Sequence, residues 1–236
     1  MQEKTSNKVK EGSVLWEPSS ELKATSNIAD YIDWLSRTRN LKFEGYFDLW
    51  DWSVNQIDEF WESIWSYFKI TSSRTFNHVI DNSEMPNTNW FQGAKLNYVE
   101  QSLKINTDST AIISKSEIRH TSKMSHRELA ARVGSFSVGL RKLGVKKGDR
   151  VCAVMPNIPE SIIGFLATAS IGAIWSACSP EFGINSIIDR FQQIEPKILI
   201  AVDGYQYGGK EFDKTLDIKD LSNTIKSLDT TIILPY

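Results

Sequence analysis

The chain has 236 residues, of which 41% are apolar and 24% are charged. This length suits one large domain or a domain with an appendage, and the composition is ordinary for a globular protein. The 27 basic and 29 acidic residues leave a net charge of −2 without any basic block, so we expect no nucleic-acid partner.

The cysteines, histidines and apolar runs argue against several classes of site. Cys152 and Cys178 lie in apolar strand-like runs, which favours two buried thiols in a reducing, cytoplasmic compartment over a disulfide. The three histidines show no metal-ligand spacing, so we expect no metal site.

Residues 1–12 lack the apolar core of a signal peptide. Residues 161–180 carry no charge, but Gly172 and several hydroxyl side chains interrupt them, which predicts a buried helix, turn and strand and no membrane span.

The N-terminal part of the chain is predicted to be helical after a tail. Residues 1–26 are polar and aperiodic, which is typical of a mobile tail. Asn27 is the expected cap of a first helix, and Ser53 with Gln56 has the pattern of a capping box. Apolar residues at helical spacing then continue over 54–68. The many aromatic side chains here are expected to pack the helices onto a larger body, in preference to forming a ligand cage.

A hairpin and a second capping box follow. Residues 110–114 and 117–124 are predicted to be two paired strands. Ser125 and Glu128 form the capping-box pattern at the start of a long helix, which is expected to end at Gly144.

From about residue 150 onward, strand and helix patterns alternate at short intervals. The predicted elements are a strand at 151–155, a helix begun by Pro159, a strand at 174–178, a helix at 185–193, and strands at 198–202 and 230–234. This alternation is typical of a parallel sheet covered by helices. Because the last apolar strand has no closing helix, we interpret the chain as truncated. An unpaired edge at 230–234 also predicts poor solubility.

Residues 204–211, GYQYGGKE, nearly match a phosphate-binding loop. Such a loop needs Ser or Thr after the lysine to hold magnesium, whereas this chain has Glu211 there. We therefore predict a glycine-rich surface loop, and an ATP phosphate site is the less favoured alternative.

Two further residues have both a functional and a structural interpretation. Cys178, beside Ser176 and Ser179, has the residue type of a nucleophile, but no histidine lies nearby in sequence and packing at a strand end is favoured. Glu181 is either an acid/base group or, as the favoured interpretation, a carboxylate in the first turn of a helix.

Three sequence blocks together resemble the acetoacetyl-CoA synthetase family, a branch of the adenylate-forming acyl-CoA synthetases. The blocks are residues 90–98 (WFQGAKLNY), 156–183 (PNIPE through GAIWSACSPEFG) and 190–210 (RFQQIEPK through VDGYQYGGK). The aromatic region before Trp90 is similar to the N-terminal cap of acetyl-CoA synthetase-like enzymes. The resemblance extends from about Val14 to Tyr236.

The resemblance implies an α/β fold with three parts. These are the tail over 1–26, a helical N-terminal cap over 27–100, and over 101–236 the incomplete first part of an AMP-binding (ANL-type) adenylation domain with a mostly parallel sheet. The family reaction joins acetoacetate to CoA through an acyl-adenylate and uses ATP and magnesium. The family's phosphate loop, ribose-binding aspartate and catalytic lysine match no position here, so we assign no catalytic residue and expect an acid–thiol ligase portion that is inactive alone.

The resemblance also implies candidate contacts to the CoA nucleotide. Phe91 is placed to stack on adenine, Gly93 to allow close backbone approach, and Arg127 or Arg132 to bind phosphate. The alternative, that the aromatic residue packs the linker and the arginines are solvated, carries equal weight. Two other functions also stay open: a non-catalytic interaction module, or part of another short-chain acyl-CoA synthetase.

Overall fold

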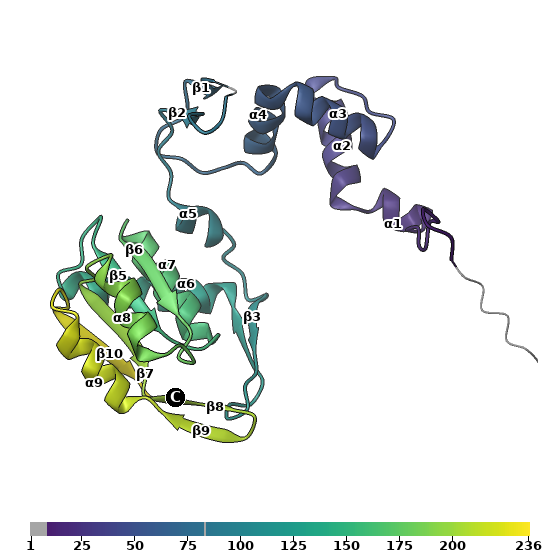
Figure 1. Ribbon diagram of the computed structural model, residues 1–236. Helices are drawn as coiled ribbons and strands as arrows, with labels where there is room; N and C mark the ends of the chain where they lie inside the picture. The colour runs from purple at the N-terminus through teal and green to yellow at the C-terminus, as the bar shows by residue number, and fades with distance from the viewer. Residues whose placement is uncertain (1–8, 83) are drawn as a thin grey trace, which may run out of the picture. The chain divides into compact units, whose positions relative to one another are not determined.

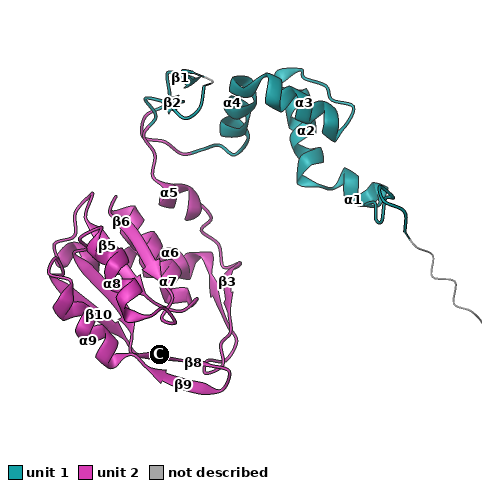
Figure 2. Cartoon of the chain, viewed as in Figure 1, with its two compact units in different colours: residues 1–70, 75–94 teal, residues 71–74, 95–236 magenta. Residues whose placement is uncertain are grey.

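A computed structural model describes residues 9–82 and 84–236, and the chain divides into two compact units (Figures 1 and 2). Unit 1 contains the residues up to 70 together with 75–94, and unit 2 contains 71–74 and 95–236. The part of the predicted tail at residues 1–8 lies outside the described residues.

Unit 1 is mainly helical with one small antiparallel pair of strands. Its elements are α1 (Ser20–Ala24), α2 (Asn27–Arg39), α3 (Tyr46–Asn55), α4 (Ile57–Tyr67), β1 (His78–Ile80) and β2 (Trp90–Gln92). Helix α1 lies inside the segment that was predicted to be a tail, and the Ser19 hydroxyl caps it by accepting a hydrogen bond from the Leu22 amide.

Aromatic packing holds the helices of unit 1 together. The buried residues Tyr31, Leu35 and Leu49 form its core. The Tyr31 ring lies 5.0 Å from Tyr67, and Trp52 lies 5.8 Å from Phe60, both in edge-to-face geometry. Aromatic pairs in this geometry add to the stability gained by burying their area. These aromatic residues therefore contact one another within unit 1, and the expectation that they pack the helices onto a larger body stays a prediction.

Two predicted helix starts in unit 1 are wrong. The cap of α2 is Ser26, whose hydroxyl accepts from the Ala29 amide, and Asn27 is already helical. The capping box at Ser53 does not form, because Ser53 lies in the last turn of α3 and donates its hydroxyl proton to the Trp50 carbonyl. Gln56 precedes α4 without a side-chain capping bond. A serine followed three residues later by glutamine also occurs in the last turn of a helix, so this pattern alone does not distinguish the end of α3 from a helix start.

Unit 2 opens with a helix, a hairpin and a long helix. Its first elements are α5 (Tyr98–Ser102), β3 (Thr110–Ser114), β4 (Ser122–Ser125) and α6 (His126–Lys142). Strands β3 and β4 pair antiparallel, as predicted, although the second strand begins five residues later than expected. The capping box is confirmed: Ser125 Oγ accepts from the Glu128 amide, and the Glu128 carboxylate accepts from the Ser125 amide. Gly144, with a φ of 79°, follows the end of the helix.

The rest of unit 2 alternates between strands and helices. Its elements are β5 (Arg150–Val154), α7 (Pro159–Ser170), β6 (Ile174–Cys178), α8 (Ile184–Gln192), β7 (Ile198–Val202), β8 (Gly204–Tyr207), β9 (Lys210–Asp213), α9 (Thr215–Thr224) and β10 (Thr230–Leu234). Within the described residues, four of these strands form a parallel sheet in the order β10-β7-β5-β6. The predicted parallel sheet is confirmed.

Helices cover both faces of the parallel sheet (Figure 1). On one face, α6 and α7 pack against side chains such as Val151 and Ile200. On the other face, α8 and α9 pack against Cys152 and Leu199. All five residues of the central strand β7 are buried. Burial on both faces explains why β7 is a continuous apolar run in the sequence rather than an alternating one.

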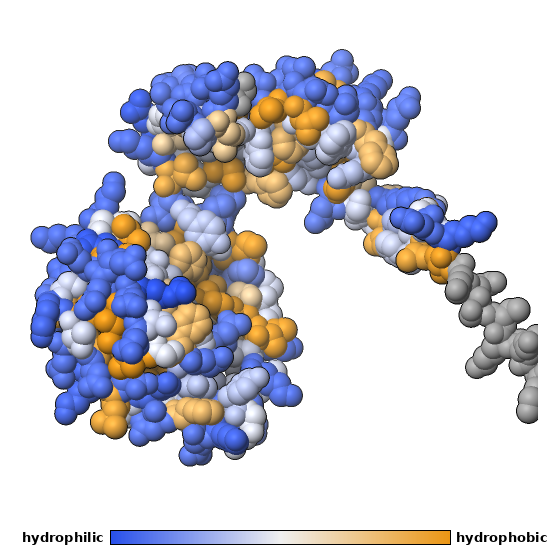
Figure 3. All heavy atoms as spheres, viewed as in Figure 1, coloured by the Kyte–Doolittle hydropathy of each residue, from blue (hydrophilic) through white to orange (hydrophobic). Residues whose placement is uncertain are grey.

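The uncharged run at 161–180 is α7, a turn at Gly172, and β6, in agreement with the sequence prediction. Within the described ranges, no helix has both the length and the apolar character needed to cross a membrane. Apolar side chains nevertheless reach the surface of each unit (Figure 3), among them Phe47 in unit 1 and Ile233 in unit 2.

Candidate functional site at the carboxyl edge of the parallel sheet

The order of the parallel strands points to a site at one edge of the sheet. Strands β5 and β7 are neighbours in the sheet. The chain leaves β5 through helix α7, which covers one face of the sheet, and leaves β7 through a connection that contains α9, which covers the opposite face. Neighbouring strands whose connections leave toward opposite faces form a topological switch point, and open α/β sheets bind ligands beyond the carboxyl ends of the strands there. The residues that follow β5, β7 and β10 are therefore the candidate site.

The segment after β7 is a hairpin, which corrects the prediction of a glycine-rich loop. Strands β8 and β9 pair antiparallel around Gly208 and Gly209, which have φ values of 60° and 74°. Successive positive φ values favour glycine at both positions of such a turn. Glycine is also needed at position 204, where a Cβ atom would lie 2.7 Å from the Phe212 carbonyl oxygen.

The amides of this turn already have an acceptor. The Gly208 and Gly209 amides both donate to the Glu117 carboxylate, each at 2.9 Å. Hydrogen bonds from the Gly209 amide, which has the larger effect, and from the Gly208 amide hold the pKa of the Glu117 carboxyl below its usual value. A phosphate loop needs its amides directed at phosphate, so this turn does not fit ATP phosphates.

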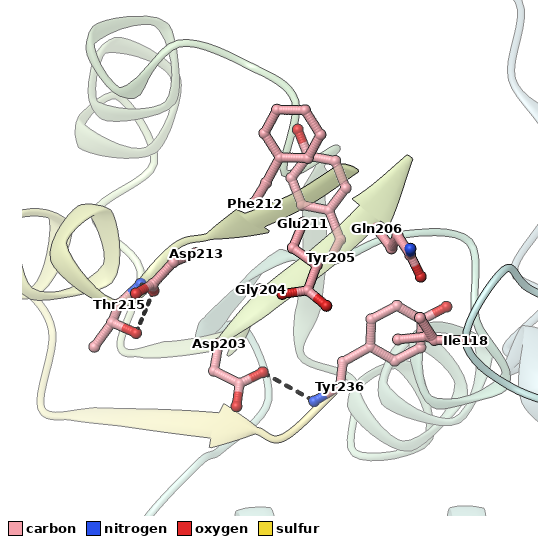
Figure 4. Close-up of a pocket in the computed structure, with 10 residues that line it drawn as sticks. All are labelled: Ile118, Asp203, Gly204, Tyr205, Gln206, Glu211, Phe212, Asp213, Thr215 and Tyr236. Carbon is pink, nitrogen blue, oxygen red and sulfur yellow. Dashed lines mark hydrogen bonds between the residues drawn. The ribbon is translucent and has the colours of Figure 1, made fainter. Parts of the chain in front are cut away.

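A cavity of about 520 Å³ lies between this hairpin and the residues that follow β7 and β10 (Figure 4). Its lining is a mixture of carboxylate, aromatic and neutral polar side chains: Ile118, Asp203, Gly204, Tyr205, Gln206, Glu211, Phe212, Asp213, Thr215 and Tyr236. The Tyr205 and Phe212 rings stack with their centroids 4.8 Å apart. The cavity has the size of a small-molecule site and combines flat apolar surfaces with hydrogen-bond acceptors.

Two carboxylates are fixed at the floor of this cavity. Asp203, directly after β7, accepts a hydrogen bond of 2.9 Å from the Tyr236 amide. Asp213, at the end of β9, accepts bonds from the side chain and the amide of Thr215, which hold the pKa of Asp213 below its usual value. These bonds fix the strand ends from which the cavity walls are built.

A second cavity, of about 130 Å³, lies beside the first turn of α7. Arg119 Nη1 donates to Glu160 Oε1 at 2.8 Å across its wall. Glu160 Oε2 is buried and has no hydrogen-bond partner within the described part of the chain. A buried carboxylate oxygen without a donor is costly, so this cavity can accept a water molecule or another small donor. Arg132 also lines it.

The predicted CoA contacts in unit 1 already have protein neighbours. The Phe91 ring lies 4.8 Å from Trp65 and 5.2 Å from Phe76, and Phe91 has a φ of 48°, a conformation that aromatic residues rarely adopt. Gly93 has a φ of 91°, and an added Cβ atom would lie 3.2 Å from the Asn77 side chain. The local fold thus accounts for glycine at position 93 without a ligand.

The predicted arginines are both on α6 in unit 2. Arg127 Nε donates to Asp108 at 2.9 Å in an exposed ion pair. Arg132 is exposed and lies at the smaller cavity. The structure brings Phe91 and Gly93 together in one unit and the two arginines together in the other. The proposal that all four contact CoA stays a prediction.

The remaining residues that the sequence singled out are Cys152, Cys178 and Glu181. Cys152 and Cys178 are free and buried, as predicted, and burial raises the pKa of both thiols. Cys178 is the last residue of β6. Glu181 does not lie in the first turn of a helix, because α8 begins only at Ile184. In residues 9–82 and 84–236, no group of three or more His, Cys, Asp or Glu side chains is placed to hold a metal ion.

Comparisons with known proteins identify the family to which this architecture belongs. A family model described as AMP-binding enzyme matches residues 99–235. The chain belongs to the AMP-binding enzyme family. A second model, described as the acetyl-coenzyme A synthetase N-terminus, matches residues 46–102.

Similar proteins indicate to which branch of the AMP-binding family this chain belongs. Acetoacetyl-coenzyme A synthetase from Rhizobium meliloti (strain 1021) is 37% identical over 222 residues, which are 94% of this chain and 34% of that protein. Acetoacetyl-CoA synthetase from Xenopus tropicalis is 36% identical over 97% of this chain and 34% of its own length. The solved structure of acetoacetyl-CoA synthetase from Streptomyces lividans matches 93% of this chain and 35% of that one, with a TM-score of 0.89 and 36% identity. The chain therefore spans about a third of the length of these relatives.

Sequence reasoning singled out residues 204–211, four of which line the larger cavity, but it missed the contacts that build the two carboxyl-edge cavities. Glu117 contacts Gly208 and Gly209 across separations of 91 and 92 residues, and Arg119 contacts Glu160 across 41 residues. No local pattern signals such pairs. The position of Asp203 directly after a buried strand was a further available signal, because strand ends in a parallel sheet are where sites form.

Proposed function

We propose that this chain forms the N-terminal part of an ATP-dependent acetoacetate–CoA ligase. The observation that carries the proposal is the match to acetoacetyl-CoA synthetases along nearly the whole chain, in sequence at 35–37% identity and in structure at a TM-score of 0.89. A relative with a different acid in its name, malonamoyl-CoA synthetase from Penicillium aethiopicum, is less similar, at 29% identity.

The proposal includes the substrates and cofactors of the reaction. Acetoacetate and CoA are proposed from the names of the relatives, and ATP and magnesium from the family resemblance. AMP binding is supported by the family itself. We keep Phe91, Gly93, Arg127 and Arg132 as proposed CoA contacts and assign no catalytic residue. We also propose a cap at 27–100, an adenylation domain that begins at 101, and a cytoplasmic location, which the two free thiols support.

A chimera tests this proposal directly. The matched first third of the Rhizobium meliloti enzyme is replaced by this chain, and acetoacetate-dependent ATP–pyrophosphate exchange is measured. We expect exchange from the chimera and none from this chain alone, because the phosphate loop and catalytic lysine of the resemblance match no position in it. A chimera that folds cooperatively but lacks exchange would contradict the proposal.

Acid selection and stand-alone activity separate the alternatives. The chimera is assayed with acetoacetate, acetate and malonamate, and preference for a different acid would move the chain to another acyl-CoA synthetase branch. Exchange by the isolated chain would show that the chemistry does not need the rest of the relatives' length. The unaltered Rhizobium meliloti enzyme is the matched control for both assays.

A further inference from the structure

Three consecutive residues between β3 and β4 contact separate elements at the carboxyl edge of the sheet. Glu117, Ile118 and Arg119 lie outside regular secondary structure, in the connection of the β3–β4 hairpin. We call residues 117–119 the strap. Each of its side chains reaches a different part of unit 2.

Glu117 binds the tip of the β8–β9 hairpin. Its Oε1 accepts from the Gly208 amide and its Oε2 from the Gly209 amide, both at 2.9 Å. Two amides that converge on one carboxylate form charge-assisted bonds, which are stronger than bonds between neutral groups. The lowered pKa of Glu117 agrees with this geometry, because the amides favour the ionised carboxylate.

The next two residues line the two cavities. Ile118 lines the larger cavity and Arg119 the smaller one. Arg119 donates to Glu160 at the start of α7, and its guanidinium carbon lies 4.4 Å from the centroid of the Tyr236 ring after β10. Its Nη2 also lies 3.5 Å from the Pro235 carbonyl oxygen. The strap is therefore fixed to the parallel sheet at one end and to the hairpin tip at the other.

The hairpin needs such an attachment. Strands β8 and β9 pair only with each other among the described residues, and all four residues of β9 are exposed. A two-stranded hairpin is marginally stable by itself in water. The position of its tip over the cavity therefore depends on contacts outside the hairpin, and the Glu117 bonds are contacts of this kind.

We propose that residues 117–119 are a strap that positions the β8–β9 hairpin over the larger cavity. We call Glu117 the latch, because its carboxylate binds the Gly208 and Gly209 amides at the hairpin tip. Arg119 anchors the strap at α7 and at the end of β10, so that loss of the latch frees the hairpin tip while the parallel sheet stays intact. Glu117 is thus a positioning residue for the cavity. The proposal concerns the shape of this cavity and does not depend on which reaction the chain serves.

Hydrogen–deuterium exchange of the full 236-residue chain tests the latch. We compare the wild type with Glu117→Ala, in which both acceptors are lost, and Glu117→Gln, in which a neutral amide oxygen remains. The matched control is Glu211→Ala, which removes an exposed carboxylate from the same hairpin without touching the turn amides. In Glu117→Ala we expect peptides over 204–213 to exchange about tenfold faster, as for the loss of hydrogen bonds to a charged acceptor.

The remaining comparisons decide between positioning and general destabilisation. Exchange in Glu117→Gln should lie between wild type and Glu117→Ala, and Glu211→Ala and the strands β5 and β7 should exchange as in the wild type. Wild-type exchange at 204–213 in Glu117→Ala would overturn the proposal. Equal acceleration in β5 and β7, or the same effect from Glu211→Ala, would also overturn it. A failed chimera assay leaves this measurement unaffected, because no activity enters it.

Discussion

Single hydrogen bonds from backbone amides to side chains fix the places where unit 2 changes direction. Ser125 ends β4 and begins α6, and its hydroxyl accepts from the Glu128 amide. Asp203 directly follows β7 and accepts from the Tyr236 amide, which ties two neighbouring strand ends together. In each case the side chain accepts from an amide that has no partner within a helix or strand. These residues stabilise boundaries rather than the core.

The capping box gives a prediction at the scale of one residue. Ser125→Ala removes the acceptor for the Glu128 amide and should lower the free energy of unfolding by about 1 kcal/mol, the usual cost of losing an N-cap. Chemical denaturation followed by circular dichroism measures the change. Ser135→Ala, on the exposed face of the same helix, is the control and should be neutral or slightly stabilising. Equal stability of the two variants would contradict a capping role for Ser125.

At the scale of elements, the sequence predicts the buried parts best. The strands at 174–178, 198–202 and 230–234 have the predicted bounds. For β7 the reason is burial on both faces, which demands a continuous apolar, β-branched run. Helix α3 was missed, since its aromatic residues also suit strands and its cap, Gly45, has no side chain that signals a start. The β8–β9 hairpin was missed because β9 is exposed, β8 is only partly buried, and neither strand has a clear apolar pattern. The larger cavity could not be predicted from the sequence either, because its walls come together only through contacts between residues that are distant in sequence.

Packing between α7 and β6 gives a prediction that opposes helix propensity. Gly164 lies in α7 under the Trp175 indole, and a Cβ atom there would be 2.9 Å from the ring. Although alanine is favoured over glycine in a helix by about 1 kcal/mol, Gly164→Ala should destabilise unit 2 by about 1–3 kcal/mol because the ring must shift.

Two further variants isolate the cause of this effect. Gly134→Ala in α6 is the matched control: apart from the backbone of its own helix and its chain neighbours, nothing lies within 4 Å of the added methyl group. Thermal and chemical denaturation should therefore show a small gain in stability. Trp175→Phe should reduce the cost of Gly164→Ala, because the smaller ring leaves room for the methyl group, and a double-mutant cycle measures this coupling. Additive effects in the cycle would refute the proposed clash.

At the scale of the whole molecule, burial falls from the centre of the parallel sheet to its edges. Strand β7 is fully buried, whereas the edge strands β6 and β10 include Ile174, 53% exposed, and Ile233, 52% exposed. Exposed apolar edge strands present unpaired backbone groups and are sites of association. The relatives contain about twice as much additional chain as is matched here, so these edges lie in a larger protein in those enzymes.

The exposed edge at β10 predicts that the purified chain associates as its concentration rises. Ile233→Lys places a charge on this edge strand and should shift the chain toward monomer, because burying a lysine between paired edges is costly. Size-exclusion chromatography with light scattering measures the mass across a dilution series. Leu216→Lys, at a 75% exposed position on helix α9 and not on a strand, is the matched control and should leave association unchanged. An equal effect of both variants would assign the association to general surface hydrophobicity, and a monodisperse, cooperatively unfolding wild-type monomer would refute the role of the edge.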